Sequence, residues 1–82
     1  MVHWLSNMIY KYLNHEQVLQ LPDKKFSWKK AYEYAKLMEM GIKFPPVRVY
    51  LNDKGILNYN DGHHRVAAAK LSGMKLFVKE SK

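Results

Sequence analysis

The sequence contains no cysteine, so disulfide bonds, thiolate zinc sites and cysteine nucleophiles are all excluded. Proline and glycine are also scarce, at three and four residues in 82, and neither gathers into a stretch typical of a linker. The opening segment, MVHWLSNMIYKYL, lacks a basic leader, a long apolar run and a small-residue cleavage site. We therefore expect one cytoplasmic domain over residues 1–82, with no signal peptide and no membrane span.

Acidic residues are also scarce. Seven acidic residues face fourteen lysines and arginines, and the resulting net charge of +7 favours anionic partners such as DNA or a nucleotide. A dense basic group interleaved with aromatic residues contains Lys24, Lys25, Lys29 and Lys30. These lysines are candidates for contacts to a nucleic-acid backbone. The alternative is a solvated helix start, the common state of lysine, with the neighbouring aromatic side chains facing the core.

Periodicity and capping residues define the first half of the fold. MIYKYL, Met8–Leu13, is typical of a strand, and Asn14 is an N-cap for a helical turn over His15–Leu19. Ser27 is a good N-cap for a second helix that runs through Met40. Three- and four-residue steps along this helix predict a buried stripe made of Trp28, Ala31, Ala35 and Met38.

The second half is predicted from turn residues. Gly41 is expected to end the second helix, and Pro45-Pro46 imposes an extended entry into a strand over Val47–Leu51. On that strand Val47, Val49 and Leu51 share one face, and Arg48 and Tyr50 share the other. The remaining predicted elements are a turn over Asn52–Gly55, a strand over Ile56–Asn60, a helix from about His64 to Ser72 closed by Gly73, and a short strand over Leu76–Val78. This order of elements indicates a small α+β domain.

The stretch DGHHR, residues 61–65, places polar groups between a strand and a helix start. Unpaired N–H groups and the positive end of a helix dipole would favour a phosphate there. Gly62 would let the backbone approach an anion, and Arg65 could bind two phosphate oxygens. The alternative is an ordinary turn in which Asp61 is the N-cap acid and Arg65 a surface residue. Composition and spacing leave both interpretations open.

Residues 43–78 resemble the ParB/sulfiredoxin superfamily. The resemblance consists of PPVRVYL, a glycine turn, a strand ending in DGHHR, an alanine-rich helix and KLSGMKLFV. It implies a ParB/sulfiredoxin-like fold, in which helices pack on a mixed sheet. It also implies that the loop binds the phosphates of a nucleotide, which is ATP or ADP in sulfiredoxins and free serine kinases and CTP in chromosome-partition proteins. The residues that would make these contacts are Gly62, His63, His64 and Arg65.

Departures from the superfamily pattern restrict the chemistry. His63 occupies the position of the catalytic cysteine of sulfiredoxins, so reduction of sulfinic acids is excluded. The loop is most similar to that of the free serine kinases, in which the acid, here Asp61, is coupled to magnesium and phosphoryl transfer. An upstream glutamate is the base in those enzymes, and Glu16 stands at a comparable position.

A metal site is a further interpretation of Asp61, His63 and His64. Adjacent histidines at a helix start point about 100° apart and seldom close on one zinc ion, so these spacings do not favour zinc. A magnesium ion held by nucleotide phosphates together with Asp61 agrees better with the preference of magnesium for few carboxylates.

Three function classes follow from these patterns. The first, which we favour, is a stand-alone regulatory domain that binds a nucleotide or phosphate at residues 61–65. The second is a small phosphotransferase or metal-dependent nuclease that uses Asp61 and a divalent ion. The third is a DNA- or protein-binding module without a nucleotide. A homodimer is compatible with each of them.

Overall fold

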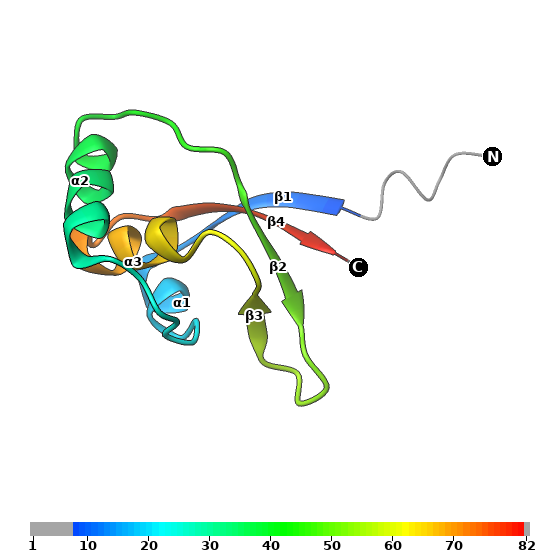
Figure 1. Cartoon of the computed structure of the whole chain (residues 1–82). Coiled ribbons are helices and arrows are strands. Elements are labelled where there is room, and N and C mark those ends of the chain that lie inside the picture. Colours follow the sequence, from blue (N-terminus) through cyan, green and yellow to red (C-terminus); the bar gives the residue numbers. More distant parts are fainter. Residues whose placement is uncertain (1–7, 82) are drawn as a thin grey trace.

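The computed structural model describes residues 8–81, which form four strands and three helices (Figure 1). In chain order these are β1 (Met8–Leu13), α1 (His15–Leu19), α2 (Trp28–Glu39), β2 (Val47–Leu51), β3 (Leu57–Tyr59), α3 (His63–Ser72) and β4 (Leu76–Ser81). Every predicted element is present. The boundaries differ most at β4, which continues three residues beyond the predicted end at Val78. The expectation of no leader segment concerns residues outside the described range.

The strands form one mixed sheet in the order β1-β4-β2-β3. The last strand, β4, lies between β1, to which it is antiparallel, and β2, to which it is parallel. The edge strand β3 forms an antiparallel hairpin with β2. This arrangement confirms the predicted α+β fold with a mixed sheet.

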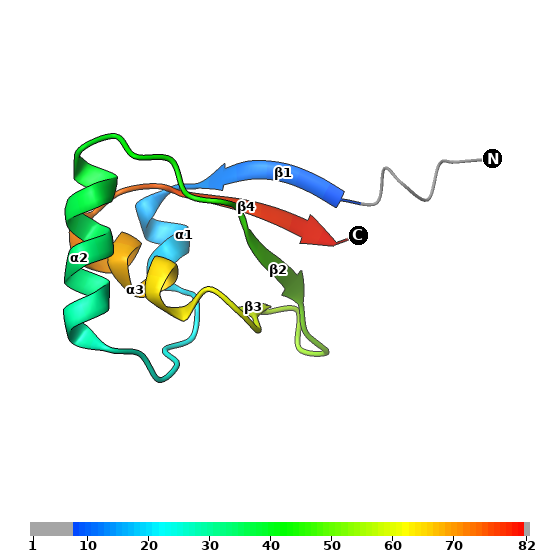
Figure 2. The ribbon, with the colours of Figure 1, turned by 45° about the horizontal axis from the view of Figure 1, so that its top comes forward.

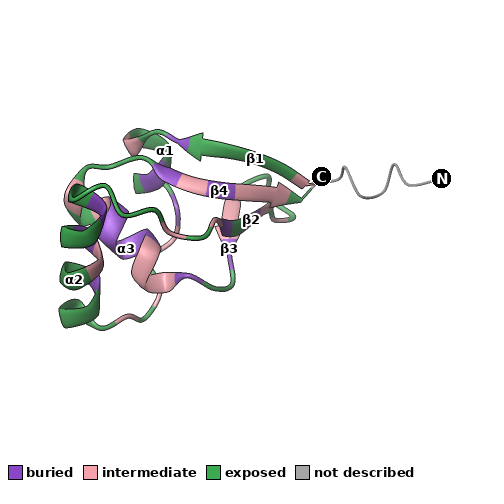
Figure 3. Cartoon of the chain, turned by 90° about the horizontal axis from the view of Figure 1, so that it is seen from above, coloured by how far each residue is buried: buried purple, intermediate pink, exposed green. Residues whose placement is uncertain are grey.

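The helices lie on one side of this sheet (Figure 2). The core between the two layers contains Val47 and Val49 of β2, Val78 of β4, and the small side chains of α3. Because Ala67, Ala68 and Ala69 carry only a methyl group, α3 can approach the sheet closely. Buried residues accordingly concentrate on α3 and the middle of β4, whereas β1 is largely exposed (Figure 3). Within residues 8–81, none of the helices has the length and apolarity needed to cross a bilayer.

Local capping signals are confirmed in detail. Asn14 and Gln17 form a reciprocal capping box at the start of α1, and the Ser27 side chain accepts the N–H of Lys30 at the start of α2. Gly41 has a φ of +88° and ends α2. Each of these features is specified by neighbouring residues, which explains why the sequence predicts them.

One predicted core position, Trp28, is wrong, and Leu51 is exposed although Val47 and Val49, which share its face of β2, are buried. Ala31, Ala35 and Met38 of the α2 stripe are buried, but Trp28 is 59% exposed. Trp28 is the first residue of α2, and its ring lies against Phe26 at the rim of the helix layer. Leu51 is also exposed because the end of β2 extends, with β3, beyond the helices (Figure 1). Periodicity gives the inward face of an element but not the point at which its partner layer ends.

The irregular segment between α1 and α2 is held by side chains from other elements. The Tyr59 hydroxyl donates to the Pro22 carbonyl at 2.7 Å, and the Lys70 ammonium donates to the Leu21 carbonyl at 2.6 Å. Lys70 also forms an ion pair with Asp23 at 2.7 Å. In the opposite direction, the Lys24 ammonium donates to the Tyr59 carbonyl. These contacts fix the path of the chain into α2.

Tyr59→Phe should lower the free energy of unfolding by about 1–2 kcal/mol, because the Pro22 carbonyl loses its donor while the ring stays in place. Tyr59 is only 1% exposed, so water cannot easily replace the lost bond. Urea unfolding followed by circular dichroism measures the change. Tyr50→Phe is the matched control, since the Tyr50 hydroxyl donates to the exposed Asn60 side chain at 3.1 Å and should contribute under about 0.5 kcal/mol. Equal losses in the two variants would contradict this prediction.

The contribution of Tyr59 should also depend on pH. Burial, and to a lesser degree the charge of Asp23, raise the pKa of the Tyr59 phenol above its usual 10.0. The unfolded chain therefore ionises this phenol at a lower pH than the folded chain does. Its stabilising effect is complete below the unfolded-state pKa and is lost as the pH rises through the folded-state pKa. The stability difference between wild type and Tyr59→Phe should shrink as the pH rises above about 10, the unfolded-state pKa, and a constant difference would contradict the assignment.

Candidate functional site

The DGHHR loop forms the corner between β3 and α3. Gly62 is the N-cap residue of α3, with a φ of +88°, and no side chain caps the first turn. The prediction that Asp61 caps this helix is therefore wrong. The Asp61 carboxylate accepts the N–H of the adjacent Gly62 at 2.8 Å, because it lies one residue too early to reach the second or third helical N–H. The first turn of α3 thus begins without a side-chain cap.

Gly62 makes room for the protein's own side chains. A Cβ atom built at this residue would lie 3.0 Å from Nη2 of Arg65 and 3.0 Å from a methyl of Val47. Gly62 is also buried and left-handed, a conformation that side-chain-bearing residues rarely adopt. The glycine is therefore required by the contact between the start of α3 and the start of β2.

Arg65 connects α3 to the double-proline segment. Its Nη1 donates to the Pro45 carbonyl at 2.7 Å and to the Pro46 carbonyl at 3.2 Å. A guanidinium has five N–H donors, and among the described residues only Nη1 of Arg65 has hydrogen-bond acceptors, so the donors of Nη2 and Nε are unused. Arg65 is consequently both a structural clamp and a candidate anion donor.

A hollow of about 240 Å³ lies beside this corner. We call it the basic hollow, and it is lined by Pro46, Arg48, Tyr50, Asn60, Asp61, Arg65 and Lys79. The lining brings three cationic side chains together with the carboxylate of Asp61. Arg48 and Lys79 occupy opposite positions in the parallel pairing of β2 with β4, so the strand register places both charges on the same face of the sheet.

The two histidines separate, as their helical spacing predicts. The His63 ring lies 5.9 Å from the Tyr59 ring, and its Nδ1 is buried with no hydrogen-bond partner among residues 8–81. The Nε2 of His64 instead accepts the Ser27 N–H at 2.9 Å, a bond that requires this nitrogen to be unprotonated. His64 thereby joins the starts of α2 and α3.

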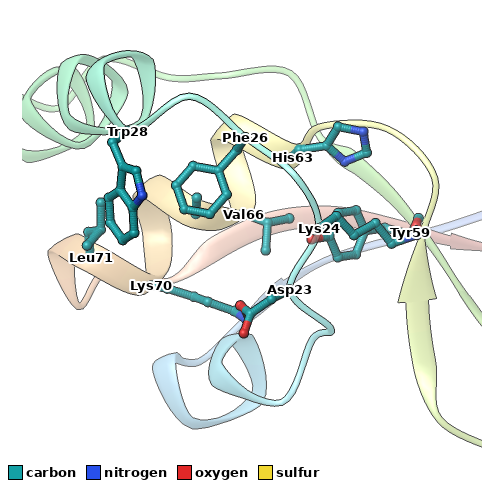
Figure 4. Close-up of a pocket in the computed structure, with 10 residues that line it drawn as sticks. Asp23, Lys24, Phe26, Trp28, Tyr59, His63, Val66, Lys70 and Leu71 are labelled. Carbon is teal, nitrogen blue, oxygen red and sulfur yellow. Dashed lines mark hydrogen bonds and ion pairs between the residues drawn. The ribbon is translucent and has the colours of Figure 1, made fainter.

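His63 lines a second, smaller hollow of about 100 Å³ between α3 and the segment that leads into α2 (Figure 4). We call it the aromatic hollow, and it is lined by Asp23, Lys24, Phe26, Trp28, Tyr59, His63, Val66, Ala67, Lys70 and Leu71. Several of its polar lining groups already bind one another, since Lys70 pairs with Asp23 and the Lys24 ammonium lies 4.8 Å from the centre of the Tyr59 ring. Of the predicted loop residues, His63 therefore lines the aromatic hollow, Asp61 and Arg65 line the basic hollow, and Gly62 and His64 line neither.

The other predicted site residues lie elsewhere. Glu16 is exposed in the first turn of α1 and lines neither hollow. Of the basic group, Lys24 is directed inward onto Tyr59, whereas Lys25, Lys29 and Lys30 are exposed. Within the described part of the chain, no three His, Asp or Glu side chains gather in a way that could hold a metal ion.

Sequence reasoning did not assign Arg48 or Lys79 to the site. Alternation along β2 correctly places Arg48 on the polar face, but only the parallel pairing with β4 shows that Lys79 lies opposite it. The predicted end of β4 at Val78 also left Lys79 outside the sheet. Residues 76–81 read Leu-Phe-Val-Lys-Glu-Ser, an apolar run followed by a polar run, so no alternation in the sequence signals that the strand continues to Ser81.

Comparisons with known proteins identify the fold. No protein-family model matches the sequence, and no curated protein sequence matches it. Among solved structures, the chain is similar to sulfiredoxin from Arabidopsis thaliana, with a TM-score of 0.65 and 20% identity over 90% of this chain and 85% of that chain. The chain thus has the sulfiredoxin-like fold that the resemblance of residues 43–78 implies.

Gly62→Ala should destabilise the fold more than Gly55→Ala. Both glycines are left-handed, and this conformation alone costs about 1–2 kcal/mol in alanine. Only at Gly62 does the added methyl meet other atoms, and we expect this crowding to cost at least about 1 kcal/mol more. Urea midpoints of the two variants, compared with that of wild type, measure the difference. Equal midpoints would show that Arg65 and Val47 move aside without cost.

Proposed function

We propose that this chain, which shares the fold of sulfiredoxin, binds a nucleotide or a related phosphate ligand where α3 begins beside the basic hollow. The observation that carries the proposal is the combination of an uncapped helix start with three cationic side chains at one corner. Asp61 and Arg65 flank Gly62 in the sequence and both line the hollow, so the helix start and the cations are adjacent. We expect the ligand to act as a regulatory signal.

The physical case rests on charge and on unused donors. The first N–H groups of a helix have no partner within it, and the helix dipole adds positive potential at the same end. Arg65 is already oriented by Pro45 and Pro46, so binding a phosphate with its remaining donors requires little ordering of the side chain. Arg48 and Lys79 would supply further charge to a ligand that carries several phosphates.

A magnesium ion would be compatible with this arrangement. It would enter with the phosphates, and Asp61 is the carboxylate among the residues that line the basic hollow. Catalysis would require in addition a base or a second acid close to the phosphates, and Glu16 does not line the hollow. We therefore favour binding over phosphoryl transfer.

Arg65→Ala should weaken nucleotide binding most, by about 1.5–3 kcal/mol, because it removes a charge-assisted contact. It also removes the bonds to Pro45 and Pro46, so loss of stability accompanies loss of affinity. Arg48→Gln separates the two effects, since Arg48 is an exposed residue of β2. We expect Arg48→Gln to weaken binding by several-fold without lowering the urea midpoint.

Calorimetric titration with ATP, CTP and inorganic phosphate, each with and without magnesium, tests this pair of variants. Lys54→Gln is the control, because Lys54 lies in the turn between β2 and β3 and does not line the hollow. Affinities that are the same in wild type, Arg48→Gln and Arg65→Ala would refute the site. Equal losses in Arg48→Gln and Lys54→Gln would indicate a general effect of net charge.

Asp61→Asn distinguishes binding from catalysis. An amide oxygen can accept the Gly62 N–H as the carboxylate does, so stability should change by less than about 0.5 kcal/mol. For a binding module we expect affinity for phosphate alone to stay the same or rise, because a negative charge leaves the hollow. The second measurement is incubation of wild type with magnesium, a nucleoside triphosphate and plasmid DNA. Hydrolysis or nicking that disappears in Asp61→Asn would establish the enzyme instead.

A further inference from the structure

The sheet has a second face, turned away from the buried residues of α3, which we call the open face; the segment between α2 and β2 borders it beside Tyr12 and Phe77. Strand register assigns to it alternate residues of β1, β4 and β2, because paired residues share a face. The core residues Val47, Val49 and Val78 point the other way, into the helix layer. The aromatic and basic residues of β1, β2 and β4 on the open face are Tyr10, Tyr12, Phe77, Lys79, Arg48 and Tyr50.

Three of these residues form a continuous aromatic row. Tyr12 and Phe77 are directly opposite each other on β1 and β4, and their ring centres lie 5.0 Å apart. Tyr10, two residues before Tyr12, lies 6.1 Å from the same Phe77 ring. Tyr10 is 59% exposed and Tyr12 is 52% exposed, so the row contributes little to the core. Contiguous exposed aromatic rings on a sheet are typical of a binding surface.

Positive charge borders this row. The Lys75 ammonium lies over one face of the Tyr12 ring, 4.4 Å from its centre, and Lys79 pairs in register with both Tyr10 and Arg48. The neighbouring acid on β4, Glu80, lies on the opposite face, where it forms an ion pair with Lys11 at 2.6 Å. The open-face strand positions named above therefore combine aromatic rings with cations and include no carboxylate.

We propose that the open face binds single-stranded nucleic acid. Bases stack on Tyr10, Tyr12 and Phe77, and the phosphates between them contact the bordering cations. Tyr10 and Tyr12 are alternate residues of one strand, about 6–7 Å apart, and the Phe77 ring packs against both of them. Aromatic rings can receive bases only when the faces of those bases are exposed, as in an unpaired strand, and stacking of this kind tolerates any base sequence. The open face meets the basic hollow at Arg48, Tyr50 and Lys79, whereas the aromatic row lies outside that hollow and its base stacking does not require the nucleotide site at α3.

A competing aromatic surface lies on α2. Trp28 and Tyr32 are exposed there, with ring centres 6.0 Å apart, near the basic group considered above. The Trp28 ring is already packed edge to face against Phe26 at 4.9 Å and lines the aromatic hollow. The open face has the longer row, and its rings are held by two paired strands. Tyr32, at 60% exposure, is therefore a matched control for Tyr12 as well as a probe of the competing surface.

The test is fluorescence anisotropy of the full chain with a labelled oligothymidylate of about 20 nucleotides and with a labelled duplex of equal length. We expect tighter binding to the single strand, and an affinity that falls as salt rises. Tyr12→Leu should weaken single-strand binding by about fivefold or more, whereas Tyr12→Phe, which keeps the ring, should bind as wild type does. Tyr32→Leu should change the affinity by less than about twofold.

Nucleotide titration of Tyr12→Leu distinguishes the two binding sites, because the affinity of this variant for ATP and CTP should equal that of wild type. Circular dichroism of each variant verifies the fold before binding is compared. Equal affinity for single strand and duplex, the absence of binding at low salt, or equal effects of Tyr12→Leu and Tyr32→Leu would overturn the proposal. A loss confined to Tyr32→Leu would assign nucleic-acid binding to α2 instead.

Discussion

The carbonyl groups of the segment between α1 and α2 impose the constraint on which the arrangement of helices depends. This segment belongs to no helix or sheet, so its backbone acceptors must find donors elsewhere or remain unsatisfied. Tyr59 and Lys70 supply those donors to Pro22 and Leu21. His64 completes the connection by accepting the N–H of Ser27, the residue that caps α2. The starts of α2 and α3 are thus joined through side chains of β3 and α3.

The same contacts explain how far the sequence predicts this molecule. Caps, turn glycines and strand alternation act over a few residues, and the elements that depend on them, such as α1 with its Asn14 cap, follow from the sequence. The order of strands does not, because the parallel pairing of β2 with β4 joins residues about 30 positions apart. The roles of Lys24, Lys70 and Arg65 are hidden for the same reason. In a sequence they resemble surface cations, yet each donates to a backbone carbonyl distant in the chain.

The candidate site illustrates this limit at one loop. The sequence identifies residues 61–65 as unusual, but adjacent side chains at a helix start diverge. His63 lines one hollow, Asp61 and Arg65 line another, and His64 contacts α2. The adjacency of residues 61–65 in the sequence therefore overstates how many of their side chains can contact one ligand. The partners that complete the charge of the basic hollow, Arg48 and Lys79, come from two strands on either side of α3 in the chain.

The central position of β4 has a consequence for how the chain folds. β4 follows the other three strands in the chain, yet it pairs with both β1 and β2, and its pairing with β1 joins residues about 70 positions apart. Closing a loop of that length has a large entropic cost before any sheet contact is gained, and such contacts slow folding. During synthesis β1 therefore has no strand partner until residues 76–81 have also left the ribosome. β1 is not a continuous apolar run, because Tyr10, Lys11 and Tyr12 interrupt it. These hydroxyl and ammonium groups oppose aggregation of the strand while it is unpaired.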